Sequence, residues 1–404
     1  MTTPVLPPAR IDFSGGTPRS LDYGDIYHAA EGAQAQAEHV FLRGNRLPQG
    51  WQGRRHFAVL ETGFGLGHNF LATWAAWRAD PQRCRHLHFV SLERHPPSRE
   101  DLARAHEHPG AGSLAHALIE AWPPLLRGLH VLTLQAGEAG TVRLTLALGD
   151  ARELLPQIVG RFDAFFLDGF APSSNPTLWD PRLLRALGRL AAPEATVATW
   201  SVARVVREGL RTAGFEVSKA PGFAAKREMT VARFTPRVMP QVPPGRPHGP
   251  WPGDRKVVVI GAGLAGACAA QTLAQLGWAC TVLDAADAPA QGASGNPAGL
   301  FHGVIHRDDG VHARLHRHAA LHAARYYGAL IHEGMVPGEV QGLLTVRALD
   351  PADPRPSALQ DAALWPGYAR ALGQEEASLR AGARLAGPAI EFTQGGWVDP
   401  AAVV

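Results

Sequence analysis

The chain has 404 residues, too many for one ordinary hydrophobic core, so two or three domains are expected. Apolar residues make up 46% of it, but the longest apolar runs are too short to span a membrane, and the polar N-terminus does not resemble a signal peptide. We therefore expect a cytoplasmic protein without a membrane partner. The balance of 39 Lys and Arg against 36 Asp and Glu permits a polyanionic partner without requiring one.

Strand-like runs alternate with helical patterns before residue 236. The expected strands are residues 57–61, 86–93, 142–150, 162–169 and 196–201, and the expected helices include 68–80 and 181–191. Alternation of this kind is typical of a mainly parallel, doubly wound sheet. We predict a Rossmann-like α/β domain over residues 1–235.

The first glycine-rich turn follows the strand at 57–61. Glu61, Gly63, Gly65 and Gly67 read E-x-G-x-G-x-G, a spacing that differs from the dinucleotide-binding pattern. S-adenosylmethionine presents an amino-acid tail instead of a pyrophosphate, so its site needs close backbone approach and a carboxylate partner. We predict that these residues, with Asn69 at the start of the next helix, bind S-adenosylmethionine.

Two further acids close the next strands of the predicted sheet. Glu93 is placed to accept the ribose hydroxyls, and Asp150 lies where the adenine would be. For each acid, a helix N-cap in a strand-to-helix loop remains an open interpretation. Their order along the chain favours a methyl-donor site.

The segment FFLDGFAPSSNPTLWD, residues 165–180, ends the fourth expected strand. Asp168 closes that strand, and Gly-Phe-Ala-Pro then makes a rigid turn. This resembles the Asp/Asn-Pro-Pro-aromatic device of amino-group methyltransferases, in which a side-chain oxygen and a backbone carbonyl orient an amine. Asp168 is placed to accept the amine's proton. A capped strand-to-helix turn is the alternative.

Prolines and glycines fill residues 236–255, which we interpret as a linker between domains. After it, Gly261, Gly263 and Gly266 form G-x-G-x-x-G between a buried run and a helix, and Asp284 ends the following strand. This unit predicts dinucleotide binding but does not separate FAD from NAD. The small-residue loop at 291–303 resembles D-amino-acid-oxidase-like flavoproteins, which favours FAD.

A segment rich in His and Arg spans residues 311–333. His312 and His316, like His318 and His322, are spaced i,i+4, but no carboxylate or cysteine joins them at ligand spacing. We predict a polar helix face and no metal site. Cys84, Cys268 and Cys280 lie too far apart to suggest a disulfide framework or a thiolate site.

Five segments together resemble the MnmC-type bifunctional tRNA wobble-uridine modification enzymes: residues 21–48, 61–71, 166–180, 222–229 and 288–300. The resemblance implies a methyltransferase domain that uses S-adenosylmethionine, followed by an FAD-dependent oxidoreductase. The flavin half of such enzymes removes the carboxymethyl group from 5-carboxymethylaminomethyl-2-thiouridine at tRNA position 34. The other half methylates the exposed amine to give 5-methylaminomethyl-2-thiouridine.

The resemblance also implies roles for single residues. Asp168 becomes the residue that contacts the substrate amine. The other implied contacts are Phe170 and Trp179 as walls of the uridine pocket, Tyr27, Lys226 and Arg227 around its mouth, and Ser294, Gly295 and Asn296 along the flavin. For the Lys-Arg pair, a solvated strand edge is the alternative.

The FAD-binding domain is expected over residues 256–404. Flavoproteins of this class return late in the chain to complete the FAD site, so we expect an incomplete domain here and leave open whether it holds FAD. We expect a monomer that acts on tRNA. The alternatives are a methyltransferase and flavin amine oxidase fusion acting on a free small amine, and a tRNA-binding scaffold without catalysis.

Overall fold

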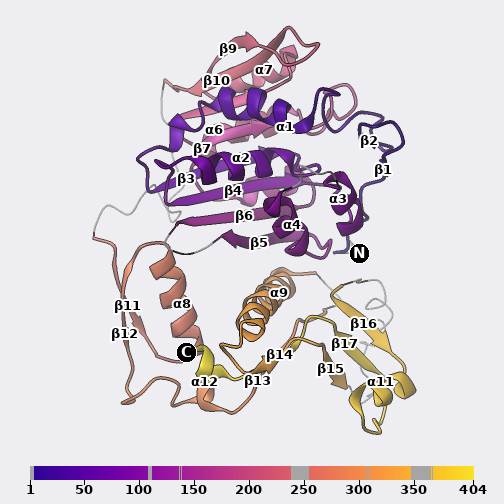
Figure 1. The fold of residues 1–404 in the computed structure, drawn as a ribbon, viewed down its shortest axis with the longest axis vertical. Coiled ribbons are helices and arrows are strands. Elements are labelled where there is room, and N and C mark those ends of the chain that lie inside the picture. The colour runs from indigo at the N-terminus through magenta and orange to yellow at the C-terminus, as the bar shows by residue number, and fades with distance from the viewer. Residues whose placement is uncertain are drawn as a thin grey trace. The chain divides into compact units, whose positions relative to one another are not determined.

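The computed structural model describes residues 4–107, 112–135, 137, 139–237, 254–306, 309–346, 365 and 367–404. The chain forms two compact units, one running from Leu6 to Pro250 and the other combining Trp251–Val404 with Met1–Val5 (Figure 1). Most of the predicted linker lies outside the described residues, so its boundaries remain a prediction.

The first unit is built on an eight-stranded sheet in the order β5-β6-β4-β3-β7-β8-β10-β9. The strands are β3 (His56–Thr62), β4 (His86–Glu93), β5 (Gly128–Gln135), β6 (Thr141–Leu148), β7 (Phe162–Leu167), β8 (Ala191–Thr199), β9 (Phe215–Pro221) and β10 (Glu228–Phe234). β6, β4, β3, β7 and β8 pair in parallel, while β5, β9 and β10 pair antiparallel. The predicted parallel core is confirmed, and the three antiparallel strands are additions to it.

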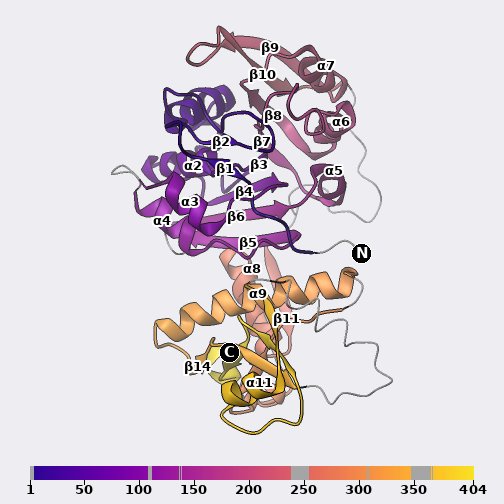
Figure 2. The same cartoon turned by 90° about the vertical axis from the view of Figure 1, so that its right-hand side faces the viewer.

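Helices cover both faces of this sheet (Figure 2). One face carries α1 (Ala33–Gln36), η1 (Ala37–Leu42), α2 (His68–Ala79), α3 (Arg99–Ala105) and α4 (Ser113–Glu120), and the other carries α5 (Ala151–Leu154), α6 (Pro181–Leu190) and α7 (Arg204–Thr212). The remaining short elements are β1 (Ile11–Asp12), β2 (Arg19–Ser20), η2 (Arg43–Asn45), η3 (Gln49–Trp51) and η4 (Leu155–Gln157). The result is a doubly wound, three-layer arrangement.

Strand β7 shows how the sequence builds two cores. Successive side chains of a strand point to opposite faces, and Phe165 and Phe166 are both fully buried. Phe166 packs against Phe41 and Phe89 in the core under α2, whereas Phe165 joins the core under α6. A strand fixed on both faces holds the residues that follow it, which include Asp168, in a defined position.

Helix α6 illustrates why the second layer forms. Asp180 caps it by accepting the Arg182 N–H at 2.7 Å, and Pro181 occupies the first turn, where a missing N–H costs nothing. Leu183, Leu187 and their neighbours are spaced at helical periodicity and lie buried against the sheet. Truncation of one such leucine to alanine would cost about 2–5 kcal/mol.

The second unit begins with the predicted strand, turn, helix and strand. β11 (Lys256–Ile260) pairs in parallel with β12 (Ala279–Leu283), and α8 (Leu264–Gln275) connects them. Its other elements are η5 (Ala293–Gly295), β13 (Gly299–Phe301), α9 (Val311–His332), β14 (Gly338–Glu339), β15 (Leu343–Val346), β16 (Ala369–Leu372), α11 (Gln374–Ala381), β17 (Ala389–Phe392), β18 (Gly396–Val398) and α12 (Pro400–Val403). They include two three-stranded antiparallel sheets, β13-β18-β14 and β15-β17-β16.

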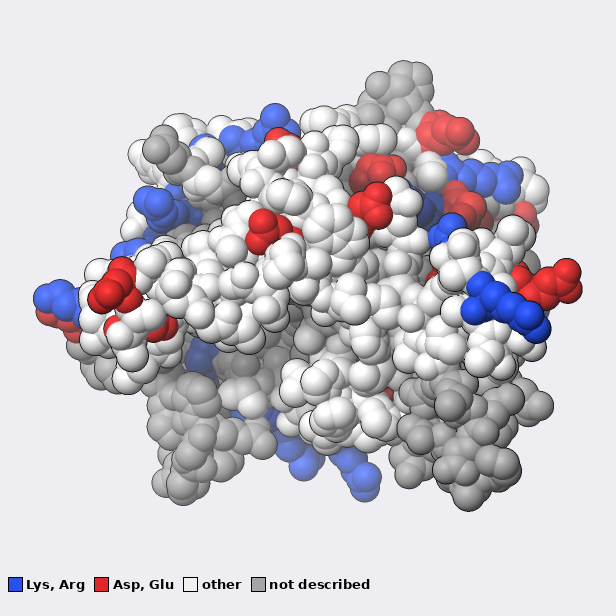
Figure 3. Space-filling view, turned by 90° about the horizontal axis from the view of Figure 1, so that it is seen from below, with Lys and Arg blue, Asp and Glu red and all other residues white. Residues whose placement is uncertain are grey.

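Several apolar side chains of the second unit remain at the surface. Ile260 is 87% exposed, and Val258 and Leu300 are also more than half exposed. One face of the molecule is mostly uncharged, with charged side chains towards its edges (Figure 3). Among the described residues, no helix has both the length and the hydropathy that crossing a membrane requires.

Candidate functional site

A cavity of about 560 Å³ opens at the carboxyl ends of the parallel strands in the first unit. Ligands of open α/β sheets bind at this edge. Its lining includes Gly63 after β3, Glu93 at the end of β4, Asp150 after β6 and Asp168 after β7. The sheet therefore brings together four of the predicted positions that are far apart in the sequence.

The turn after β3 requires glycine for its conformation. Gly63, Gly65 and Gly67 have φ angles of 81°, 54° and 78°, which side-chain-bearing residues adopt rarely. A Cβ atom on Gly63 would lie 3.0 Å from the carbonyl oxygen of Asp168, and one on Gly65 would lie 3.3 Å from the ring of Tyr27. The turn thus runs between the two residues that we predicted to contact substrate.

Glu61 is not among the residues that line the cavity, so its contact with the methyl donor stays a prediction. Its side chain is fully buried, and its carboxylate accepts hydrogen bonds from Ser91 Oγ at 2.6 Å and Asn69 Nδ2 at 2.9 Å. Burial raises the pKa of Glu61 well above its usual range. Its role in the structure is to hold Asn69, which does line the cavity.

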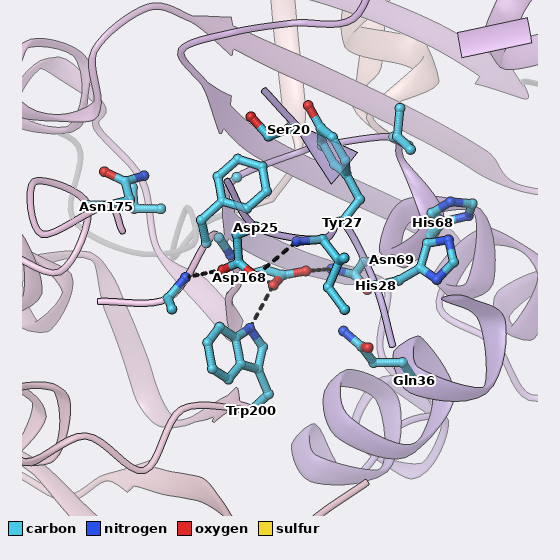
Figure 4. Close-up of a pocket in the computed structure, with 18 of the residues that line it drawn as sticks. Ser20, Asp25, Tyr27, His28, Gln36, His68, Asn69, Asp168, Asn175 and Trp200 are labelled. Atoms are coloured by element: carbon cyan, nitrogen blue, oxygen red, sulfur yellow. Dashed lines mark hydrogen bonds between the residues drawn. The ribbon is translucent and has the colours of Figure 1, made fainter. Parts of the chain in front are cut away.

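Three donors in the described part of the chain give hydrogen bonds to the Asp168 carboxylate (Figure 4). Oδ1 accepts from the Gly169 N–H at 2.8 Å and from Trp200 Nε1 at 3.2 Å, while Oδ2 accepts from Asn69 Nδ2 at 2.8 Å. Burial raises the pKa of Asp168 to about 6, against the opposing effect of these donors. A carboxylate has about four lone-pair sites, so one remains on Oδ2 for a ligand.

Glu93 and Asp150 line the cavity and are each held by backbone donors. Glu93 accepts the Gly65 N–H at 2.9 Å and the His95 N–H at 2.7 Å, and burial raises its pKa. Asp150 caps α5 by accepting the Arg152 N–H at 2.9 Å, and hydrogen bonding from the Arg152 side chain lowers its pKa. The alternative capping role of Asp150 is therefore present together with its position in the lining.

A segment before α1 covers the cavity from one side. Tyr23 stacks on Phe170 with ring centroids 4.8 Å apart, and Tyr27 meets Phe170 edge to face at 5.2 Å. Asp25 accepts the Ala171 N–H at 2.9 Å, which ties this segment to the turn after β7. Burial raises the pKa of Tyr27. Tyr27 and Phe170 line the cavity, and their contact with substrate stays a prediction; Tyr23 and Asp25 line it too and were not singled out from the sequence.

Trp179 lies behind the cavity wall and supports Phe170, so its predicted contact with the uridine stays a prediction. Its side chain is 2% exposed, and its indole N–H donates to the Phe170 carbonyl at 2.8 Å. Trp200 is the tryptophan that lines the cavity. Of the predicted Lys-Arg pair, Lys226 lines the cavity and Arg227 does not.

The second glycine-rich turn has the close packing that a dinucleotide site needs. Gly261 has a φ of 106°, and a Cβ on Gly266 would lie 1.8 Å from the Gly261 carbonyl oxygen. A Cβ on Gly263 would lie 3.0 Å from Ser294 Oγ, which accepts the Leu264 N–H at 3.0 Å. The predicted flavin loop therefore lies directly against the turn.

Asp284 and the end of that loop complete this part of the structure. Asp284 accepts the Ala262 N–H at 2.6 Å, and backbone hydrogen bonding lowers its pKa. Gly295 lies so close to the Ala290 carbonyl oxygen that a Cβ would be 2.4 Å away, and Asn296 follows it in extended conformation. These positions fit the pyrophosphate and ribose of a dinucleotide.

The fold and the two sites define a class: an S-adenosylmethionine-dependent methyltransferase unit followed by an FAD-binding oxidoreductase unit. Family models agree with this assignment. One described as an S-adenosyl-L-methionine-dependent methyltransferase matches residues 109–235, and one described as an FAD dependent oxidoreductase matches residues 256–404. The predicted fold class and the two cofactors, S-adenosylmethionine and FAD, are thereby confirmed.

Curated relatives extend the similarity over nearly the whole chain. The tRNA 5-methylaminomethyl-2-thiouridine biosynthesis bifunctional protein MnmC of Methylibium petroleiphilum is 52% identical over 99% of this chain and 61% of its own length. The protein of the same name from Cupriavidus metallidurans is 47% identical over 98% of this chain and 60% of its own length. The resemblance to the MnmC-type family is confirmed, and the chain spans about three fifths of the length of these relatives.

A solved structure, MNMC2 from Aquifex aeolicus, is 24% identical with a TM-score of 0.46. The match covers 58% of this chain and 73% of that chain.

Proposed function

We propose that the protein modifies the wobble uridine of tRNA in two steps, as a cytoplasmic monomer. In the first step, the FAD-dependent unit removes the carboxymethyl group from 5-carboxymethylaminomethyl-2-thiouridine at position 34. In the second, the methyltransferase unit converts the exposed amine to 5-methylaminomethyl-2-thiouridine. The name and the extent of similarity of the curated relatives support this substrate.

The proposal rests mainly on the hydrogen bonding and position of the Asp168 carboxylate. Its carboxylate is held by three donors and keeps a lone pair on Oδ2 beside the glycine turn after β3. An amine that reaches this oxygen can donate its N–H to it. Phe170 and Tyr27, which meet edge to face, offer an aromatic wall for the uridine ring.

S-adenosylmethionine supplies the methyl group when it is bound. Asp168 Oδ2 would take a proton from the acceptor ammonium group, which leaves the nitrogen with the free lone pair that it needs to accept the methyl group. Glu93 and Asp150 would hold the ribose and the adenine. Because the displacement is in line, the main contribution of these residues is positioning.

In the second unit, FAD supplies the oxidising chemistry at the carbon–nitrogen bond when it is bound. The glycine turn would hold its pyrophosphate at the start of α8, and Asp284 would hold the ribose hydroxyls. Ser294, Gly295 and Asn296 would lie along the flavin. Arg227 and Lys226 would contact the tRNA around the methyltransferase pocket.

The test supplies the full chain with S-adenosylmethionine labelled in its methyl group. Its acceptors are tRNA that carries 5-aminomethyluridine at position 34, the same tRNA with unmodified uridine, and a panel of free amines. Label should enter only the aminomethyl tRNA. Label confined to free amines would favour a small-molecule amine as substrate, and a complete absence of transfer would favour a binding scaffold.

The oxidoreductase step has its own measurements. Purified protein should show a flavin absorbance band near one FAD per chain. Incubation with tRNA that carries the carboxymethylaminomethyl group should then leave 5-aminomethyl-2-thiouridine after nuclease digestion. Protein that is fully loaded with FAD but leaves the carboxymethyl group in place would contradict this half of the proposal.

A further inference from the structure

Lys226 sends its ammonium group into the methyltransferase cavity. Its Nζ lies 3.3 Å from the centroid of the Trp200 ring, a distance at which a cation is attracted to the ring face. Burial lowers the pKa of Lys226, while the nearby carboxylates of Asp25 and Asp168 raise it. The ammonium group therefore sits between an aromatic face and negative charge.

The hairpin between β9 and β10 is shaped to present this lysine. The Gly222 N–H donates to the Arg227 carbonyl at 3.0 Å, and the Lys226 N–H donates to the Phe223 carbonyl at 3.1 Å. A Cβ on Gly222 would lie 2.2 Å from the Lys226 carbonyl oxygen, and Ala224 adopts a left-handed φ of 54°. A non-glycine residue in this conformation indicates backbone strain held by its surroundings.

The indole of Trp200 and the carboxylate of Asp168 form adjoining walls. The β7–β8 register pairs Phe166 with Ala198, so the residues two positions further along each chain are neighbours. The indole edge donates to Asp168 Oδ1 at 3.2 Å, and the indole face carries the Lys226 ammonium. One corner of the cavity thus offers both interactions that bind an alkylammonium group, an aromatic face and a carboxylate.

We propose that this Trp200–Asp168 corner is the subsite for the acceptor's aminomethyl group, and that Lys226 occupies it until the acceptor displaces it. The inference rests on the proposed function and goes beyond it, because it makes Trp200 a contact for the acceptor and Lys226 an internal competitor. Lys226 lies in the loop between β9 and β10, and part of its side chain is open to solvent, so the side chain has room to leave. The Lys226 ammonium and a substrate aminomethyl group have the same charge and hydrogen-bonding capacity, which is why one can replace the other.

The test compares two nucleosides that differ in one group. 5-Aminomethyluridine carries the amine, and 5-hydroxymethyluridine is a neutral counterpart of nearly the same size. Equilibrium dialysis measures the affinity of each for the full chain in the presence of S-adenosylhomocysteine, which prevents turnover. Lys226→Gln is the test variant, and Lys219→Gln is the matched control, since Lys219 is an exposed lysine of the same hairpin that pairs with Glu228.

Removal of the competitor should tighten binding of the amine nucleoside by roughly tenfold, the strength of a partly buried cation–π contact. Affinity for the hydroxymethyl nucleoside should change less than about twofold, and Lys219→Gln should match the wild type. Adding Trp200→Leu to Lys226→Gln should remove the gain. Because Leu at position 200 could disturb the fold, S-adenosylhomocysteine binding by each variant serves as the check on the pocket.

Three results would overturn the proposal: Lys226→Gln binding the amine nucleoside no more tightly than wild type, gaining equally for both nucleosides, or binding neither. The proposed function is tested separately by methyl transfer to tRNA. If aminomethyl tRNA accepts no methyl group while the amine-specific gain is observed, the subsite stands and the proposed substrate is wrong. If tRNA is methylated but no gain is observed, the subsite fails alone.

Discussion

Replacement of Asp168 by asparagine should strongly slow methyl transfer and, at alkaline pH, stabilise the protein. The two effects share one cause. The carboxylate is held in a largely buried position, where burial raises its pKa from 3.8 to about 6. A raised carboxyl pKa means that the folded state disfavours the ionised form, so stability declines as pH rises from about 4 to 6 and stays reduced above that range.

The size of the effect follows from the shift. About two pKa units at 1.36 kcal/mol each give a cost near 3 kcal/mol at pH 8, and about half of that at pH 5. The side chain keeps part of its surface open to the cavity, so water reduces these figures. Asp168→Asn also loses the hydrogen bond from Asn69, which lowers the stability of the variant by about 1 kcal/mol. The net gain should be about 1–2 kcal/mol at pH 8 and near zero at pH 5.

Thermal unfolding of the full chain at the two pH values measures the gain. For a unit of this size, each kcal/mol shifts the unfolding midpoint by about 2–4 °C. Asp168→Asn should therefore unfold about 2–8 °C above wild type at pH 8, and at the same temperature as wild type at pH 5. Transfer should fall by about 10²–10⁴-fold, while S-adenosylmethionine binding is retained. Asp180→Asn, which keeps a side chain able to cap α6, is the control. Equal destabilisation by Asp168→Asn at both pH values would refute the reasoning and make the carboxylate structural.

Three further substitutions test other contacts. Asn69→Ala removes a donor that lowers the pKa of Asp168, so the acidic limb of the transfer rate against pH, expected near 6, should move up by about one unit; an unmoved limb would exclude this role. Gly65→Ala places a Cβ in a left-handed conformation against the Tyr27 ring, and should weaken S-adenosylmethionine binding in dialysis by about tenfold. Gly266→Ala puts a Cβ 1.8 Å from the Gly261 carbonyl oxygen, and should eliminate FAD uptake, measured by absorbance, while methyl transfer persists. Retained flavin in that variant would show that the turn can relax.

The sequence predicted the strands that are buried on both faces and missed those that are not. β7 reads as a continuous apolar run because both of its faces are covered, and β3 and β4 behave alike. β5 and β9 lie at the two edges of the sheet and expose alternate residues, so their apolar pattern is weak. Edge strands are therefore the part of this fold that local hydrophobicity indicates least.

Within the site, the sequence indicates which segments lie near the cavity better than it indicates which side chains point into it. Glu61 and Trp179 are both buried behind the pocket. Their positions at a strand end and after a turn indicate that they lie near the site, but not whether their side chains point into the cavity or into the core. Trp200 was missed although it lay inside an expected strand, because only the pairing of β7 with β8 brings it to Asp168. A contact between residues on two paired strands produces no sequence motif in either strand by itself.

The two glycine-rich turns select different ligands through the charges around them. In the first, the Gly65 N–H is already donated to the Glu93 carboxylate, and Asp150 and Asp168 line the same cavity. Converging carboxylates repel a pyrophosphate and attract a ligand with a sulfonium and an ammonium group. In the second, the helix starts tightly against the strand at Gly266, which aims its first amides at an anion. The spacing of the glycines sets the shape of each turn. Around the first turn Glu93, Asp150 and Asp168 converge, whereas the second turn contacts Asp284 and opens onto the start of a helix, so the two sites favour ligands of opposite charge.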